Sequence, residues 1–229
     1  MISICVPTRG RPEFFKRMCL SALENASDPN DIEFISYRDN DDASDYEYFG
    51  NHKEVVGDRI NHSQTFNECY KIATGPLYML GSDDMVFYTK EWDTCVKEAF
   101  DRSADKIIFV YPNDRYARSR FGVNPFLHKN WIDTVGYFAP PYFVAWYSDY
   151  WLNDVATKIN RKVFLRGVVI KEIGIDEHAG QIQDKTQEEY EKRKHENNCK
   201  EIYFSKEAER KKNAQLLQDF INNFKTICI

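Results

Sequence analysis

Two adjacent carboxylates, Asp83 and Asp84, follow the apolar run 77–80 and a glycine. Neighbouring carboxylates repel each other, so placing them together at the end of a strand is costly unless a cation lies beside them. Mg²⁺ or Mn²⁺ suits such a position, because hard divalent ions bind one or two carboxylates together with substrate phosphate oxygens. A solvated turn or a helix cap is the alternative explanation for the pair. Its position directly after an apolar strand favours the metal site.

The elements that must position this pair follow from the order of the hydrophobic patterns. Short apolar runs alternate with amphipathic stretches in the first half of the chain, which is typical of strands and helices in turn. We expect strands at 2–6, 32–37, 53–57, 77–80 and 106–112, and helices at 13–26, at 63–75 with Gly75 as its end, and at 90–100. A mainly parallel sheet of this kind binds ligands at the carboxyl ends of its strands. The loops VPTRGRP, RDNDD and GSDD should therefore converge.

The second half of the chain is less regular. The segment 121–159 is dense in aromatic residues, glycine and proline, and we expect it to form a lid or a wall for an acceptor substrate. The last forty or so residues are rich in charged helix formers and end in a helix with an apolar stripe: Leu217, Phe220, Ile221 and Phe224. That stripe should pack on the body of the domain, and a homodimer through this helix is the alternative.

Composition limits the classes of function. The 229 residues fit one globular unit, and a net charge of −5 gives no general attraction to nucleic acid or to anionic lipid. The six cysteines show no CxxC spacing, which indicates reduced, buried thiols. The N-terminal residues contain neither a basic leader nor a long apolar run, so we expect a cytoplasmic protein without a membrane span.

Neither GxxxxGK[ST] nor GxGxxG occurs, so another architecture must hold any nucleotide. The stretches ISICVPTRGRPEFFKRMCLSAL, YRDNDD and NECYKIATGPLYMLGSDDMVF resemble the nucleotide-binding half of GT-A fold glycosyltransferases of the family 2-like type. Asn67, Ala73 and Gly75 match the helix that precedes the Asp-x-Asp metal motif in that family. Ser82 stands where many relatives carry the first carboxylate. Asp84 is therefore the first choice for the metal, with Asp83 bridging to the metal or to the ribose.

The resemblance covers about residues 2–185 and implies an α/β GT-A fold, with a mixed, mainly parallel sheet flanked by helices. We expect residues 1–185 to form one glycosyltransferase domain and 186–229 to form a C-terminal helical extension. Within the domain, about 1–112 would bind the nucleotide and about 113–185 the acceptor.

The same resemblance assigns residues to the donor nucleotide: Pro7, Thr8, Arg9, Arg11 and Asp39, with Asp83 and Arg59 as further candidates. Asp39 would hydrogen-bond the base, although Asp41 and Asp42 in the same loop are alternatives. Arg59 would reach the base or the diphosphate. Without the resemblance, the arginines read as solvated surface residues and Asp39 as a turn residue.

Two further residues complete the expected site. His178 follows the strand-like run 162–175, and a histidine at this point in similar enzymes completes the metal shell, although a lone histidine is more often a surface or core residue. Asp149 lies near the start of an expected helix, where the resemblance places a catalytic base that takes a proton from the acceptor hydroxyl. Helix capping is the alternative for Asp149 and for Asp154, five residues further on.

These observations predict a metal-dependent glycosyltransferase that moves a sugar from a nucleotide-diphosphate donor, expected to be a UDP-sugar, to a hydroxyl of a glycan or another acceptor. Attack from the face opposite the diphosphate would invert the anomeric carbon. The rivals are a nucleotidyltransferase of similar fold and a non-catalytic carbohydrate-binding relative. A nucleotidyltransferase would need basic side chains that bind a triphosphate. A non-catalytic binding relative should tolerate loss of the metal-binding carboxylates.

Overall fold

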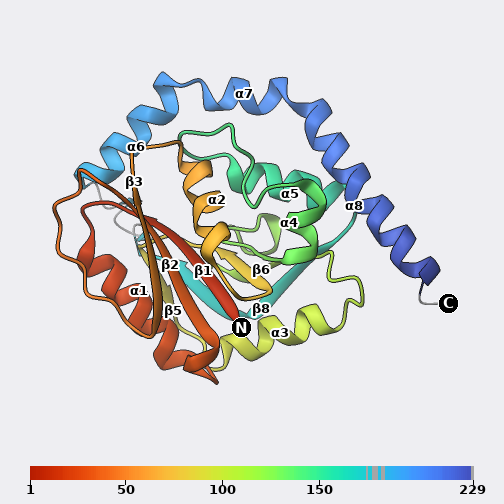
Figure 1. The fold of residues 1–229 in the computed structure, drawn as a ribbon, viewed down its shortest axis with the longest axis horizontal. Helices are drawn as coiled ribbons and strands as arrows, with labels where there is room; N and C mark the ends of the chain where they lie inside the picture. Colours follow the sequence, from red (N-terminus) through yellow and green to blue (C-terminus); the bar gives the residue numbers. More distant parts are fainter. Residues whose placement is uncertain (174, 177–179, 182–183, 228–229) are drawn as a thin grey trace.

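The computed structural model describes residues 1–227 apart from 174, 177–179 and 182–183. Eight of its strands form one sheet in the order β3-β2-β1-β4-β7-β6-β8-β5 (Figure 1). The strands of this sheet are β1 (Ile2–Thr8), β2 (Ile32–Asp39), β3 (Asn51–Gly57), β4 (Leu77–Leu80), β5 (Met85–Phe87), β6 (Phe109–Asn113), β7 (Phe126–His128) and β8 (Lys162–Glu172). The short strands β9 (Ile175–Asp176) and β10 (Gly180–Gln181) pair with each other.

The helices alternate with these strands and then follow them. They are α1 (Pro12–Asn25), α2 (His62–Ile72), α3 (Trp92–Asp101), α4 (Lys129–Val135), α5 (Ser148–Lys158), α6 (Lys185–Glu196), α7 (Cys199–Ser205) and α8 (Glu207–Ile227), with short 3₁₀ turns η1 (Pro29–Asp31) and η2 (Arg118–Arg120). Pro12 takes the first position of α1, where its missing N–H costs nothing.

The sheet is mainly parallel, as expected for an α/β fold. β1 runs parallel to β2 and β4, β2 runs parallel to β3, and β6 runs parallel to β8, whereas β7 and β5 pair in the antiparallel sense. The loops after β1, β2 and β4 therefore open at the same edge of the sheet. This arrangement brings the three expected loops together.

Both faces of the sheet are covered, so its central strands are buried throughout. Along β1, Ile4 and Val6 point into the apolar core beneath α1 and α3, while Cys5 points into the core beneath α2, α4 and α5. Alternation of side chains along a strand produces this division. A continuous apolar run is therefore the correct sequence signal for a strand in the middle layer.

The end of α2 differs from the prediction. The helix ends at Ile72, and Ala73 is already extended, so Gly75 does not cap it. A Cβ atom at position 75 would lie 2.7 Å from the carbonyl oxygen of Met1 and 2.8 Å from Ser3 Oγ. Gly75 is needed because the chain passes close to β1, and the buried carboxylate of Glu33 accepts the Gly75 N–H at 3.0 Å.

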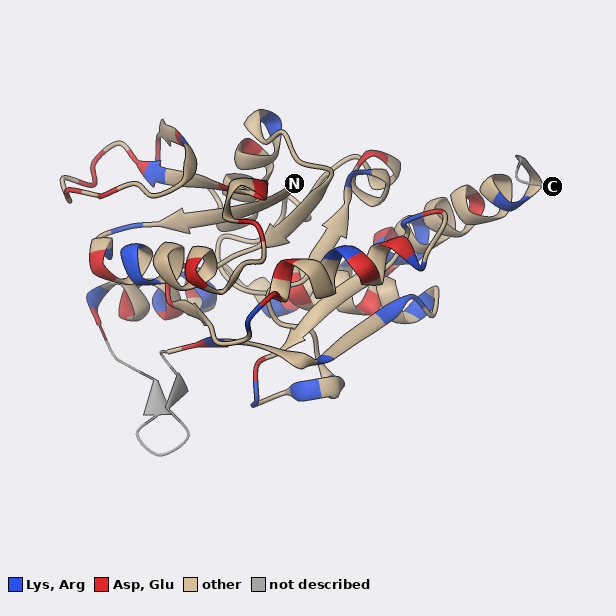
Figure 2. Cartoon of the chain, turned by 90° about the horizontal axis from the view of Figure 1, so that it is seen from below, with Lys and Arg blue, Asp and Glu red and all other residues tan. Residues whose placement is uncertain are grey.

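The last three helices follow one another around the outside of α2, α5 and α4 (Figure 1). Leu217 and Ile221 of α8 are buried in the core that includes α4 and α5, which confirms that the apolar stripe packs on the body. Acidic and basic residues are mixed along α8 (Figure 2). Dimerisation through this helix stays a prediction. Within the described residues, no helix combines the length and the hydrophobicity that crossing a bilayer requires.

Candidate functional site

A cavity of about 570 Å³ opens at the carboxyl ends of β1, β2 and β4. Its lining joins the loops after these strands to segments that are remote in sequence, namely the start of α5, the end of β8 and helix α6. Every expected site residue within the described part of the chain lines it: Pro7, Thr8, Arg9, Arg11, Asp39, Arg59, Asp83, Asp84 and Asp149. The fold therefore gathers into one cavity residues that the sequence places up to 142 positions apart.

The loop after β1 turns sharply at Gly10. Its φ of +66° is a left-handed conformation that glycine adopts without steric cost, and its N–H donates to Asp42 Oδ2 at 2.9 Å. This turn aims the side chains on either side of it, Arg9 and Arg11, at the cavity. Both arginines are ion-paired by carboxylates.

Two of the arginines expected at the donor nucleotide, Arg11 and Arg59, are held by neighbouring acidic groups. Arg11 donates to both oxygens of Asp184, at 2.8 Å and 2.7 Å, and also lies 3.3 Å from Asp83 Oδ1. Arg59 pairs with Glu189 at 2.6 Å. Asp184 is the residue just before α6, and Glu189 lies within it. The start of this helix therefore supplies the carboxylates that pair with the two guanidinium groups. A bound diphosphate would have to share or replace these partners.

The three candidate carboxylates of the second loop have different surroundings. Asp39 lines the cavity and lies 3.1 Å from Arg9 Nη1 and 3.6 Å from Arg59 Nε. Burial raises the pKa of Asp39, while the two arginines act in the opposite direction. Asp41 is an exposed partner of Arg9, and Asp42 accepts hydrogen bonds within its own loop. Of the three, only Asp39 belongs to the lining of the cavity.

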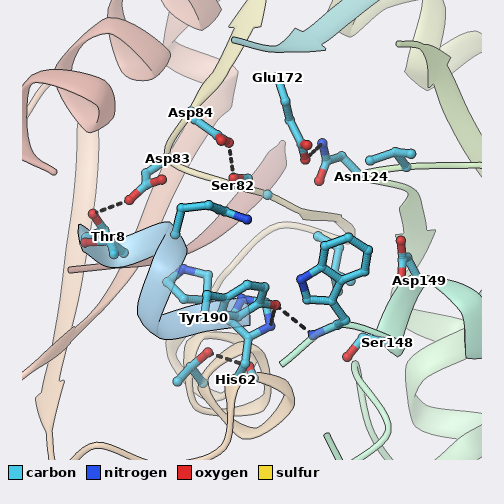
Figure 3. Close-up of a pocket in the computed structure, with 18 of the residues that line it drawn as sticks. Thr8, His62, Ser82, Asp83, Asp84, Asn124, Ser148, Asp149, Glu172 and Tyr190 are labelled. Carbon is cyan, nitrogen blue, oxygen red and sulfur yellow. Dashed lines mark hydrogen bonds between the residues drawn. The ribbon is translucent and has the colours of Figure 1, made fainter. Parts of the chain in front are cut away.

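The carboxylate pair after β4 is held by close packing against β1. Gly81 donates its N–H to the carbonyl of Cys5 at 2.9 Å, and a Cβ at Gly81 would lie 2.9 Å from that same oxygen. Asp83 is buried and accepts a hydrogen bond from Thr8 Oγ1 at 2.9 Å, and Ser82 donates to Asp84 (Figure 3). Only a glycine before the pair lets the chain approach β1 this closely.

A third carboxylate faces the pair from β8. Glu172 lies across from Asp84 and accepts a hydrogen bond from Asn124 Nδ2 at 3.1 Å (Figure 3). Burial and the negative charge of Asp84 raise the pKa of Glu172 to about 8. Burial and the same neighbour raise the pKa of Asp83 to about 7, against the opposing effect of Arg11. Charge repulsion at this end of the cavity is thus incompletely relieved.

These oxygen donors fit a hard divalent cation, which would neutralise the repulsion among Asp83, Asp84 and Glu172. Within the described residues, no group of three potential ligands is already gathered closely enough to form a complete metal site. Substrate oxygens or a further protein ligand would have to complete the shell. His178, the expected ligand, lies outside the described residues.

Asp149 lies in the first turn of α5, on a different wall of the cavity from Asp83 and Asp84 (Figure 3). Its carboxylate accepts the N–H of Tyr150 at 2.8 Å, and burial raises its pKa from 3.8 to about 6. Asp154 instead pairs with Lys158 at 2.6 Å and Arg210 at 2.7 Å, outside the cavity lining. The two carboxylates of α5 therefore have separate environments, as expected for residues about 1.4 helical turns apart.

Helix α6 supplies a wall that sequence patterns did not reveal. Tyr190 shares a hydrogen bond with His62 Nδ1 at 3.1 Å and accepts the N–H of Trp146 at 2.8 Å (Figure 3). Arg193, also in the lining, donates to the carbonyl of Ile60 at 3.2 Å. These contacts fasten α6 over the cavity. The charged helix formers of 185–196 predicted a helix, but its weak amphipathic pattern gave no sign of which face would be buried or that it would border the cavity.

Comparison with known proteins gives the fold. No family model matches the chain, and no curated protein matches its sequence. Among solved structures, S. aureus TarS has a TM-score of 0.59 at 11% identity, covering 76% of this chain and 37% of TarS. A TarS fragment in complex with UDP-GlcNAc gives 0.57 at 12% identity, covering 74% of this chain and 57% of the fragment.

A mannosyltransferase from Pyrobaculum calidifontis, solved in complex with GDP-Man and Mn²⁺, also has a TM-score of 0.57. It is 12% identical, with 78% of this chain and 58% of the mannosyltransferase covered. The chain thus spans between about a third and three fifths of the length of these structures. The likeness establishes a GT-A-like glycosyltransferase fold, as the sequence resemblance predicted.

Proposed function

We propose that the chain is a metal-dependent glycosyltransferase that uses a nucleotide-diphosphate sugar, with a UDP-sugar as the expected donor. The observation that carries this proposal is the division of one cavity into two chemical halves. Asp83 and Asp84, with Arg11 paired to Asp83, lie in one half and Asp149 lies in the other, with Glu172 at the end of β8 between them (Figure 3). The solved neighbours that bind UDP-GlcNAc or GDP-Man support the same class of donor.

The donor half would bind the nucleotide through its base and its diphosphate. Asp39 can accept an imide N–H of the base, while Arg9 and Arg11 can donate to phosphate oxygens. Asp84, Asp83 and, by the family resemblance, His178 would hold a divalent ion. That ion, when bound, would stabilise the charge that develops on the departing diphosphate.

The acceptor half would position a hydroxyl beside Asp149. A carboxylate with a pKa of about 6 is ionised at neutral pH yet basic enough to take a proton during attack on the anomeric carbon. Attack from this side, opposite the diphosphate, would invert the configuration. The free thiols of the five described cysteines suit a reducing compartment, and on this ground we propose a cytoplasmic site of action.

Thermal-shift measurements with nucleotide sugars test the proposal, since a ligand that binds the folded state raises its melting temperature. UDP-GlcNAc, UDP-glucose and GDP-mannose would each be added with and without Mn²⁺. We expect stabilisation by a UDP-sugar that requires Mn²⁺ and is lost in Asp84→Ala. Undiminished Mn²⁺-dependent binding in a folded Asp84→Ala variant would contradict the role of this residue.

Product analysis separates the two rival functions. A glycosyltransferase releases the nucleoside diphosphate, whereas a nucleotidyltransferase consumes a triphosphate and releases pyrophosphate. A non-catalytic relative would bind sugars without release of either product. Detection of pyrophosphate with a sugar 1-phosphate and UTP as substrates would replace the proposed function with the first rival.

A further inference from the structure

A short loop between β6 and β7 contributes to the cavity lining and also carries three exposed arginines. We call residues 114–121 the arginine loop. Its Arg115, Arg118 and Arg120 are exposed, while its Tyr116 and Phe121 line the cavity. Basic side chains and cavity-lining aromatic side chains thus alternate along one segment. The three arginines are therefore immediate sequence neighbours of residues that line the cavity.

These arginines differ from those of the donor half in their partners. Within the described residues, Arg115, Arg118 and Arg120 form no ion pair with an acidic side chain. Arg118 and Arg120 donate to carbonyl oxygens of their own loop, those of Arg115, Tyr116 and Ala117. Arg11 and Arg59, in contrast, are paired with the carboxylates of Asp184 and Glu189. In a chain of net charge −5, the loop carries three arginines against the single carboxylate of Asp114, whose oxygens accept backbone N–H groups.

The backbone of the loop is fixed in a form that displays these side chains. The carboxylate of Asp114 accepts the N–H groups of Tyr116, Ala117 and Arg118 at 3.1, 3.0 and 2.8 Å. Arg115 and Arg118 have φ values of +64° and +54°, which are unfavourable for residues with a side chain. Such strain persists only where surrounding contacts enforce it, and here the hydrogen bonds of Asp114 do so.

Aromatic rings connect the arginine loop to the expected base. The ring centroids of Phe121 and Tyr150 lie 4.6 Å apart, and Tyr150 directly follows Asp149. Tyr116 and Tyr150 are 66% and 41% exposed, so part of each side chain is accessible to a ligand. Rings of this kind stack on the apolar faces of sugars, and adjacent guanidinium groups pair with phosphate or carboxylate oxygens.

We propose that the acceptor is an anionic glycan, whose negatively charged groups bind Arg115, Arg118 and Arg120 while a neighbouring sugar lies on Tyr116 and Tyr150. This inference rests on the proposed glycosyltransferase function and names the substrate class for its acceptor half. Phosphate and carboxylate groups share the chemistry that guanidinium groups recognise. The experiment therefore includes one glycan of each kind.

Binding of labelled oligosaccharides to the full chain tests the proposal without requiring transfer. The probes are phosphorylated maltodextrin, oligogalacturonide and neutral maltodextrin of the same length. We expect the protein to bind at least one anionic probe about tenfold or more tightly than the neutral one, with affinity falling as salt rises. The triple variant R115Q/R118Q/R120Q should lose that preference, and R115K/R118K/R120K should retain most of it.

A matched variant controls for net charge. K71Q/R102Q/K200Q removes three exposed positive charges that do not line the cavity, and it should bind the anionic probes as the native chain does. Equal loss in both triple variants, or equal affinity for anionic and neutral probes, would overturn the proposal. Tighter arginine-dependent binding of a single-stranded RNA of matched charge, or of vesicles containing anionic lipid, would also overturn it.

Affinity for UDP in the presence of Mn²⁺ is measured on the same samples. We expect it to be unchanged in R115Q/R118Q/R120Q, because the loop lies outside the donor half. Absence of nucleotide binding in the native chain would refute the proposed function. Normal nucleotide binding with no preference for anionic glycans would refute only the acceptor proposal.

Discussion

Replacement of Asp149 by asparagine should make the protein more stable at neutral pH and catalytically deficient. Burial of the carboxylate raises its pKa from 3.8 to about 6, and a change of one in pKa corresponds to about 1.36 kcal/mol. Keeping Asp149 ionised in the fold thus costs up to about 3 kcal/mol. Because the side chain still borders the solvent of the cavity, we expect Asp149→Asn to recover about 2 kcal/mol of this cost. The amide oxygen can still accept the N–H of Tyr150.

The pH dependence of this gain has a definite sign. The folded chain holds the proton of Asp149 more tightly than the unfolded chain, because its pKa is raised. The stability that Asp149 contributes is therefore complete below about pH 4 and is lost as the pH rises through about 6. Asparagine has no such titration. The difference in free energy of unfolding between variant and native protein should grow by about 2 kcal/mol between pH 4 and pH 7.

Urea unfolding across this pH range measures the stability, and sugar transfer to a true acceptor measures the activity. The kcat of Asp149→Asn should fall by about 10²–10⁴-fold with the UDP-sugar affinity nearly unchanged. Asp154→Asn is the matched control on the same helix. It should retain activity and lose about 1–2 kcal/mol, since it removes the anionic partner of the buried Arg210.

Two results would refute this reasoning about Asp149. One is that Asp149→Asn unfolds at a lower urea concentration than the native protein at pH 7.5. In that case burial would not be the cause of the raised pKa of Asp149. The other is a native kcat in Asp149→Asn together with a deficient Asp154→Asn, which would assign the base to the other carboxylate.

Three further changes test the donor half and the packing beneath it. Asp184→Asn keeps an N-cap oxygen for α6 but removes the negative charge beside Arg11. The affinity for UDP, measured by calorimetric titration, should therefore rise about fivefold. An unchanged affinity would mean that Arg11 does not contact the diphosphate. Gly75→Ala should lower the free energy of unfolding by about 2–3 kcal/mol, because its Cβ would lie 2.7 Å from the Met1 carbonyl oxygen. If the variant is as stable as the native protein, the strand relaxes to make room for the methyl group. His178→Gln should weaken Mn²⁺ binding in the presence of UDP about tenfold or more, and an anomalous-scattering map of Mn²⁺–UDP crystals with the ion far from His178 would remove it from the metal shell.

The sequence by itself determined the layered α/β architecture and the edge at which the chemistry lies. Short, largely apolar runs such as 2–6 and 32–37 are typical of strands in the middle of a covered sheet, and parallel strands send their following loops to one edge. Local patterns therefore predicted that the loops carrying Asp39, Asp83 and Asp84 converge, while the choice of Asp39 over Asp41 and Asp42 rested on the family resemblance. The local pattern also predicted that Asp149 lies near the start of a helix, whereas its place in the site was implied only by the family resemblance.

The tertiary structure alone decided which charges meet in that cavity. Arg11 pairs with Asp184, 173 positions away, and Glu172 faces Asp84 from an antiparallel strand that no local pattern orients. The predicted end of α2 was wrong for a similar reason, since Gly75 is required by the close approach of the chain to β1 and not by the helix. Periodicity reports which side of an element is buried, whereas the partner of a polar side chain depends on how distant segments pack, and that is fixed only when the whole chain folds.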